Sequence, residues 1–240
     1  MAIATSEILE RARFQPEAEM RTRLVERFGL AEASSHIPED ERARSERSLR
    51  EIRASMTRLT RGMASGLIRL VEETLERLGL EPQAELLIEP TEEINASAYG
   101  ILDDSGKHLI CLTAGIVKQL TDEQLRCILG HEIGHNAYGH TQLIDDISLI
   151  YRDEDEVPEL LGSQIRVLRR LQEFSADRAG LVAVNNNITT SAGALLHGLT
   201  GLGPEDIHLD LDAFTDEIAR LEAFNIPDKL GLDSHPLLPL

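Results

Sequence analysis

Apolar residues recur at helical spacing through most of the first 80 residues. Between residues 49 and 63 the steps alternate between three and four, which is the spacing of a heptad seam. Its members are Leu49, Ile52, Met56, Leu59 and Met63. We favour a helix that lies on its own domain over the alternative, a coiled-coil contact with a helical partner through residues 39–63. The apolar stripe shifts across Gly62 and Gly66, where we expect a bend or a break.

From residue 84 the pattern changes to short apolar runs that are typical of strands, at 86–88, 94–101 and 108–113. Turn residues at 103–106 separate the last two runs. Helical spacing then returns. Thr121 and Gln124 have the spacing of a capping box, which opens a predicted helix that ends near Tyr138. Further helices are predicted at 160–184, 191–199 and 211–224, followed by an irregular tail that contains prolines.

Composition and charge limit the partners that this chain can have. The 240 residues carry a formal net charge of −18, which repels phosphate, so we expect no nucleic-acid partner. No apolar run approaches the roughly 20 residues that cross a bilayer, and the start of the chain does not resemble a signal peptide. The two cysteines, Cys111 and Cys127, show no CxxC pairing. These features predict a soluble, cytoplasmic protein without a membrane span.

The motif HEIGH is the strongest indication of chemistry. His131 and His135 are four residues apart, so on a helix both imidazoles project from one face and can share a metal ion. Glu132 is offset by one residue, which suits a general base that takes a proton from water at that metal. The alternative is an ordinary helix with two surface histidines. Gly130 and Gly134 leave the helix bare enough for close packing, and a buried His-Glu-His needs a metal.

A catalytic zinc ion usually has three protein ligands and an open position. Candidates for the third ligand are His140, the acidic run at 153–156 and Glu173. His140 is rotated off the ligand face, and adjacent carboxylates are typical of a solvated loop, so we favour Glu173. Asp177 lies one turn further on the same face and suits an acceptor for the N–H of a ligand histidine. A solvated acidic face is the alternative for Glu173 and Asp177.

HEIGH at 131–135 followed by EFSAD at 173–177 resembles the gluzincin peptidases of the HtpX and CaaX prenyl protease family. The soluble members of that family, the minigluzincins, are the most similar. INASAYG at 94–100 resembles the edge strand with which family members bind substrate. HLICLTAGIVKQLTDEQL at 108–125 resembles the strand and helix that precede their active-site helix. The resemblance covers about residues 65–185.

This resemblance implies an α+β, mostly helical, zincin-like fold. Its expected parts are a small mixed sheet, a backing helix, the HExxH helix and a glutamate helix. We divide the chain into a helical N-terminal region, 1–62, and a metallopeptidase domain, 63–240. One Zn²⁺ per chain is expected. The membrane helices of HtpX and the prenyl proteases are missing from this sequence, so prenylated substrates are not implied.

The resemblance also implies roles for residues outside the metal ligands. Asn95 and Ala96 would offer their backbone to an extended peptide, which adds to the sheet as a strand. His235, in a late His-Pro pair, would stabilise the oxyanion; the alternative is a loop histidine. The family pattern has an arginine several residues after that pair, and this sequence has none.

The function expected from these features is a zinc-dependent metalloendopeptidase that acts on unstructured or partly unfolded polypeptide. The alternative is a zinc-stabilised scaffold or binding module that is latent or does not cleave. The helical residues 1–80 motivate this alternative, because they exceed what a minimal gluzincin needs. Latency has a second candidate cause, the apolar tail at 234–240, which either occludes the cleft or packs on the domain surface.

Overall fold

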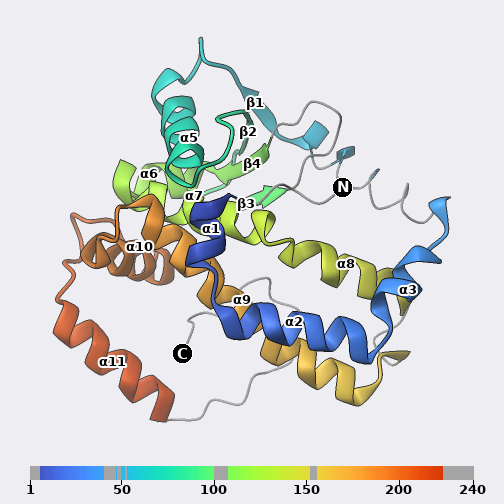
Figure 1. Ribbon diagram of the computed structural model, residues 1–240. Coiled ribbons are helices and arrows are strands. Elements are labelled where there is room, and N and C mark those ends of the chain that lie inside the picture. Colours follow the sequence, from blue (N-terminus) through green and yellow to red (C-terminus); the bar gives the residue numbers. More distant parts are fainter. Residues whose placement is uncertain are drawn as a thin grey trace.

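The computed structural model describes residues 6–40, 47, 50–51, 53–99, 108–151 and 156–223. Helices surround one small sheet, and the long helices α2, α8 and α9 extend away from it (Figure 1). In chain order the elements are α1 (Glu7–Ala12), α2 (Gln15–Arg27), α3 (Leu30–Ser35), β1 (Thr57–Leu59), α5 (Ser65–Arg77), β2 (Ala84–Glu89), β3 (Ala96–Tyr99), β4 (His108–Thr113), α6 (Ala114–Gln119), α7 (Asp122–Ala137), α8 (His140–Ile150), α9 (Glu159–Ala183), α10 (Ile188–Thr200) and α11 (Leu211–Ala223).

The sheet has four strands in the order β1-β2-β4-β3. β2 and β4 are parallel and the other pairs are antiparallel, so the sheet is mixed, as predicted. Every residue of β4 is buried. One face of the sheet packs on α5 and α7, and side chains on the other face form a smaller apolar cluster. The smaller cluster consists of Leu87, Leu109 and Cys111, with Met56 and Tyr99 packed against it. The expectation of a mostly helical α+β fold with a small mixed sheet is confirmed.

The predicted helix over the heptad seam is wrong at residues 57–59, which form β1 and pair with β2. Met56 and Leu59 pack against the apolar clusters on the two opposite faces of the sheet. Two residues that are three positions apart lie on one face of a helix but on opposite faces of a strand. Pairing with β2 decides that this segment is a strand. The helical partner predicted through residues 39–63 is therefore not supported. Leu49 and Ile52 lie outside the described residues.

Most other predicted elements are confirmed. The break expected near Gly62 and Gly66 occurs as a turn before α5. β4 has the predicted bounds, and α9 agrees with the predicted helix to within one residue at each end. α7 begins with the predicted capping box: the Thr121 side chain accepts from Gln124 N–H, and the Gln124 side chain accepts from Thr121 N–H. The predicted turn at 103–106 and the tail after residue 223 lie outside the described residues.

α7 and α9 pack closely because their contact surfaces consist of small residues. A Cβ added at Gly130 would lie 2.5 Å from Cβ of Ala183, and one added at Gly134 would lie 2.7 Å from Cβ of Ala179. A Cβ added at Gly180 would lie 2.8 Å from the carbonyl oxygen of Cys127. No side chain larger than glycine fits at these points without moving a helix. The sequence therefore brings the backbones of the HExxH helix and the glutamate helix close together.

The N-terminal helices pack on the rest of the chain. Leu9 of α1 belongs to the main core together with the sheet and α7, and the Tyr138 hydroxyl donates to the Leu9 carbonyl oxygen at 2.8 Å. Leu24 of α2 packs with residues of α8 and α9 in a second core cluster. The division of the chain at residue 62 stays a prediction.

Candidate metal centre

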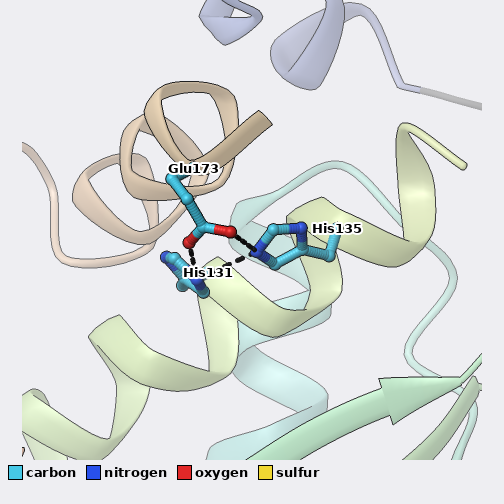
Figure 2. A group of neighbouring side chains, drawn as sticks. All are labelled: His131, His135 and Glu173. Carbon is cyan, nitrogen blue, oxygen red and sulfur yellow. Dashed lines mark hydrogen bonds and ion pairs between the residues drawn. The ribbon is translucent and has the colours of Figure 1, made fainter. Parts of the chain in front are cut away.

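His131 and His135 of α7 and Glu173 of α9 point toward one another (Figure 2). The Nε2 atoms of the two histidines are 3.0 Å apart. Glu173 places Oε2 at 3.5 Å from Nε2 of His131 and Oε1 at 3.5 Å from Nε2 of His135. Among the described residues, this is the group of histidine, cysteine and carboxylate side chains that could hold a metal ion.

The size of this triangle suits a zinc ion. Ligand atoms at 2.0–2.1 Å from an ion and at tetrahedral angles are separated by about 3.3 Å. The distances of 3.0 Å between the imidazoles and 3.5 Å from each imidazole to the carboxylate lie on both sides of that value. Two imidazole nitrogens and a carboxylate oxygen are also a donor set that zinc accepts, with a fourth position free for water or substrate.

The other ring nitrogen of each histidine faces a buried or half-buried partner. Nδ1 of His131 is 2.9 Å from Oδ1 of Asp177, which lies on α9 one turn after Glu173. Nδ1 of His135 is 2.8 Å from Nδ1 of His140, the first residue of α8. A partner at Nδ1 fixes the orientation of the ring and leaves Nε2 for the ion. Both imidazoles therefore present the same nitrogen to the triangle.

The protonation of the two histidines differs. Burial lowers the pKa of His131, but the hydrogen bonds to Asp177 and Glu173 outweigh it and raise the pKa well above its usual value. Burial, together with the charge of His131, lowers the pKa of His135 to about 3. His135 is thus neutral, as a ligand must be, whereas a metal ion has to displace a proton from His131.

Glu132 is buried on α7 next to His131 in the sequence, and its charge contributes to the raised pKa of His131. Its carboxylate does not belong to the triangle of ligand atoms, so an ion bound there would not take it up as a ligand. This is the arrangement that a general base needs. Its role stays a prediction.

The structure distinguishes among the candidates for the third metal ligand. Glu156, the last residue of the predicted acidic run, is exposed and outside the triangle, and residues 153–155 lie outside the described residues. His140 is not a member of the triangle either, but it is buried and contacts the ligand His135. No local pattern along the chain indicated this contact, because it depends on the turn at Gly139. His235 lies outside the described residues.

The turn at Gly139 returns the chain over α7. Gly139 has φ of 65°, a left-handed conformation that favours glycine. Arg21 of α2 holds the turn, since its guanidinium donates to the carbonyl oxygens of Tyr138 at 2.9 Å and Gly139 at 2.8 Å. His140 follows directly and thereby reaches the side of His135 that faces away from Glu173.

β3 is one of the two edge strands of the described sheet and lies against the HExxH helix. Asn136 of α7 donates to the Tyr99 carbonyl oxygen at 2.7 Å and so connects the helix to this strand. Asn95 turns its N–H toward the Thr113 hydroxyl at 3.0 Å and its carbonyl toward Thr113 N–H at 3.1 Å. Because main-chain groups alternate in direction along an antiparallel strand, those of Ala96 and Ala98 turn away from β4, and both residues are buried.

Comparison with known proteins finds a family that part of this chain resembles. Residues 63–151 match peptidase family M48. We call this stretch, which is similar to M48 peptidases, the M48 segment. It contains the sheet from β2 onward and the whole HExxH helix, whereas Glu173 and Asp177 lie beyond it.

Two curated relatives resemble the chain over short stretches. A protease HtpX homolog from Sulfurovum sp. is 35% identical over 75 residues, which are 31% of this chain and 26% of the relative. A protease HtpX homolog from Methanocaldococcus jannaschii is 38% identical over 69 residues, which are 29% of this chain and 23% of the relative. The matches thus span about a quarter of the length of these relatives. No solved structure matches the chain. Among the helices that the structure describes, none is long and apolar enough to cross a membrane.

Proposed function

We propose that this protein is a zinc-dependent metalloendopeptidase in which His131, His135 and Glu173 hold one Zn²⁺ and Glu132 is the general base. The convergence of two Nε2 atoms and one carboxylate within 3.5 Å of one another carries the proposal. The M48 segment and the HtpX names of the relatives support a protease. When bound, the ion would supply Lewis acidity, which lowers the pKa of water and polarises a peptide carbonyl.

The residues of the chain would divide the remaining work. Glu132 takes a proton from the attacking water and returns it to the leaving amine. Asp177 accepts from Nδ1 of His131 and keeps that ring oriented. His235, which lies outside the described residues, is proposed from the sequence alone to stabilise the oxyanion.

The edge of β3 that turns away from β4 would bind the substrate as an added strand. Ala96, one of the two residues predicted to offer its backbone, turns its main-chain groups away from β4, as does Ala98. The other, Asn95, has its N–H and carbonyl bonded to Thr113 and would instead set this alternation. Strand addition recognises an extended backbone more than particular side chains, which favours unstructured or partly unfolded polypeptides as substrates.

The substitution Glu132→Gln tests the central part of this proposal. We expect it to leave zinc stoichiometric and to reduce peptide hydrolysis by about 10²-fold or more, because it removes proton transfer but retains the shape of the side chain. Zinc content is measured by elemental analysis and hydrolysis with a proteome-derived peptide library. Full activity in a zinc-replete Glu132→Gln variant would rule out the role of Glu132.

A latent or non-catalytic scaffold is the second candidate function. The burial of Leu9 and Leu24 in two core clusters favours it, because α1 and α2 are built into the structure around the centre. Zinc-replete wild-type protein that cleaves no member of the library would favour the scaffold. Cleavage that depends on Glu132 would exclude it.

A further inference from the structure

A fully buried carboxylate lies behind the candidate metal centre. Glu17 of α2 has no solvent exposure. It accepts from Arg13 through Nε at 2.7 Å and through a terminal nitrogen at 3.0 Å, and from the Ser175 hydroxyl of α9 at 3.2 Å. Burial raises the pKa of Glu17, but His140 and Arg13 outweigh it and hold the pKa at about 2. Removing a charge from water is costly, so a buried carboxylate needs specific partners. Arg13 is only one of the groups that surround the carboxylate of Glu17.

His140 lies between this carboxylate and the ligand His135. Its Nδ1 is 2.8 Å from Nδ1 of His135, and its Nε2 is 3.8 Å from Oε1 of Glu17. His140 is itself buried, and its Nε2 has no hydrogen-bond partner among the described residues. The carboxylate of Glu17 is thus the anion that faces this nitrogen.

With the proposed ion bound at Nε2 of His135, the positions of the nitrogens allow one arrangement of protons. His135 directs Nε2 to the metal triangle, so its proton is on Nδ1. Nδ1 of His140 must then accept that proton in a hydrogen bond, since two N–H groups would repel each other at 2.8 Å. The proton of neutral His140 is consequently on Nε2, and it points to the negative charge of Glu17.

We propose that His140 and Glu17 are positioning residues for the metal ligand His135, so that helix α2, from outside the M48 segment, completes the metal centre. His131 receives direct support from Asp177 on α9, and His135 receives it from α2 through His140. The proposal rests on the proposed zinc centre. It assigns the N-terminal helices a role in metal binding besides the core packing of Leu9 and Leu24.

Three substitutions at His140 separate this role from packing. The side-chain oxygen of His140→Asn lies where Nδ1 lies in histidine and can still accept from His135, whereas His140→Gln moves its acceptor away and His140→Leu has none. We expect zinc affinity to fall about 10–100-fold in the Leu and Gln variants. The loss should be clearly smaller in the Asn variant, which keeps the acceptor for His135 and loses only the contact with Glu17. His208→Leu at an exposed histidine is the matched control and should bind zinc as wild type does.

Affinity is measured on the full chain by competition with a chelator, and the absorption spectrum of the Co²⁺ form reports the geometry of the ligands. The melting temperature of each metal-free variant shows whether the fold is intact. The Asn and Gln variants are both polar and similar in size, so the comparison of their zinc affinities tests the proposal even if the Leu variant is unstable. Equal affinities in the Asn and Gln variants with intact folds would overturn the proposal.

A double-mutant cycle tests the place of Glu17. Glu17→Gln removes the charge and should weaken zinc binding in the wild-type background. In the His140→Leu background it should have no further effect on zinc, because the connection is already broken. If the losses in zinc affinity of the two single variants add up in the double variant, Glu17 acts independently of His140 and the proposal is overturned. Wild-type protein that binds no zinc would refute the zinc centre itself, whereas normal binding by every variant refutes this inference alone.

Discussion

At the scale of single residues, the candidate centre depends on what lies behind each ligand. His131 and His135 are equivalent in the motif, but a carboxylate supports one and a neutral imidazole supports the other. This difference accounts for their opposite pKa shifts, because Asp177 raises the pKa of His131 while burial lowers that of His135. Zinc binding should therefore release a proton from His131 and weaken as the pH falls.

The residue-scale prediction compares three carboxylates. Glu173→Ala removes a charged ligand atom and should abolish tight zinc binding. Asp177→Asn keeps an oxygen near Nδ1 of His131 but loses the charge, so we expect zinc affinity to fall about 10–100-fold. Glu156→Ala is the control, since this side chain is exposed and outside the triangle. Zinc titration measures all three, and unchanged binding by Glu173→Ala would remove the carboxylate from the ligand set.

At the scale of elements, the distance between α7 and α9 sets the geometry of the centre. The two histidines come from one helix and Glu173 from the other, so the triangle closes only when the backbones are close. Gly130, Gly134 and Gly180 permit this approach. Metal geometry and helix packing thus depend on the same contact surface.

A methyl group at this surface should disturb both properties. Gly134→Ala places a Cβ 2.7 Å from that of Ala179, and we expect it to destabilise the fold by about 1–3 kcal/mol and to weaken zinc binding. The control is Gly198→Ala on α10, where a Cβ meets nothing within 4 Å and helix propensity predicts a gain of up to about 1 kcal/mol. Denaturant unfolding and zinc titration are the measurements. Normal zinc affinity in Gly134→Ala would show that the centre tolerates a shift of α9.

At the scale of the whole molecule, the centre connects parts of the chain that are far apart in the sequence. α7 and α9 supply the ligands, and α2 contacts the turn at Gly139 and approaches His140 through Glu17. An ion held by two helices stabilises the folded chain, since the unfolded chain does not keep the ligands together.

Metal removal should therefore lower the stability of the whole chain. At a free zinc concentration of 100 times Kd, linkage predicts about 2.7 kcal/mol of added stability, which is a rise of several degrees in the melting temperature. A chelator should reverse the rise. In Glu173→Ala the same zinc concentration should have little effect. A wild-type melting temperature that does not respond to zinc would contradict a folded-state site.

Much of the fold could be read from local patterns along the chain. The capping box of α7, the run that forms β4 and the span of α9 were predictable, because hydrophobic period and cap chemistry depend on neighbouring residues. The HExxH spacing likewise places His131 and His135 on one helix face whatever the rest of the chain does. Glu173 and Asp177 could be proposed from the sequence because their helix has a recognisable apolar side.

Long-range contacts decided the rest. Met56 and Leu59 are compatible with a helix or a strand, and β1 forms because β2 offers a pairing edge that no local pattern reveals. His140 reaches His135 through the left-handed turn at Gly139, and Glu17 approaches it from more than a hundred residues earlier in the chain. Helical spacing describes directions within one element. The partners behind His135 come from two other elements, so only their packing in three dimensions could place them.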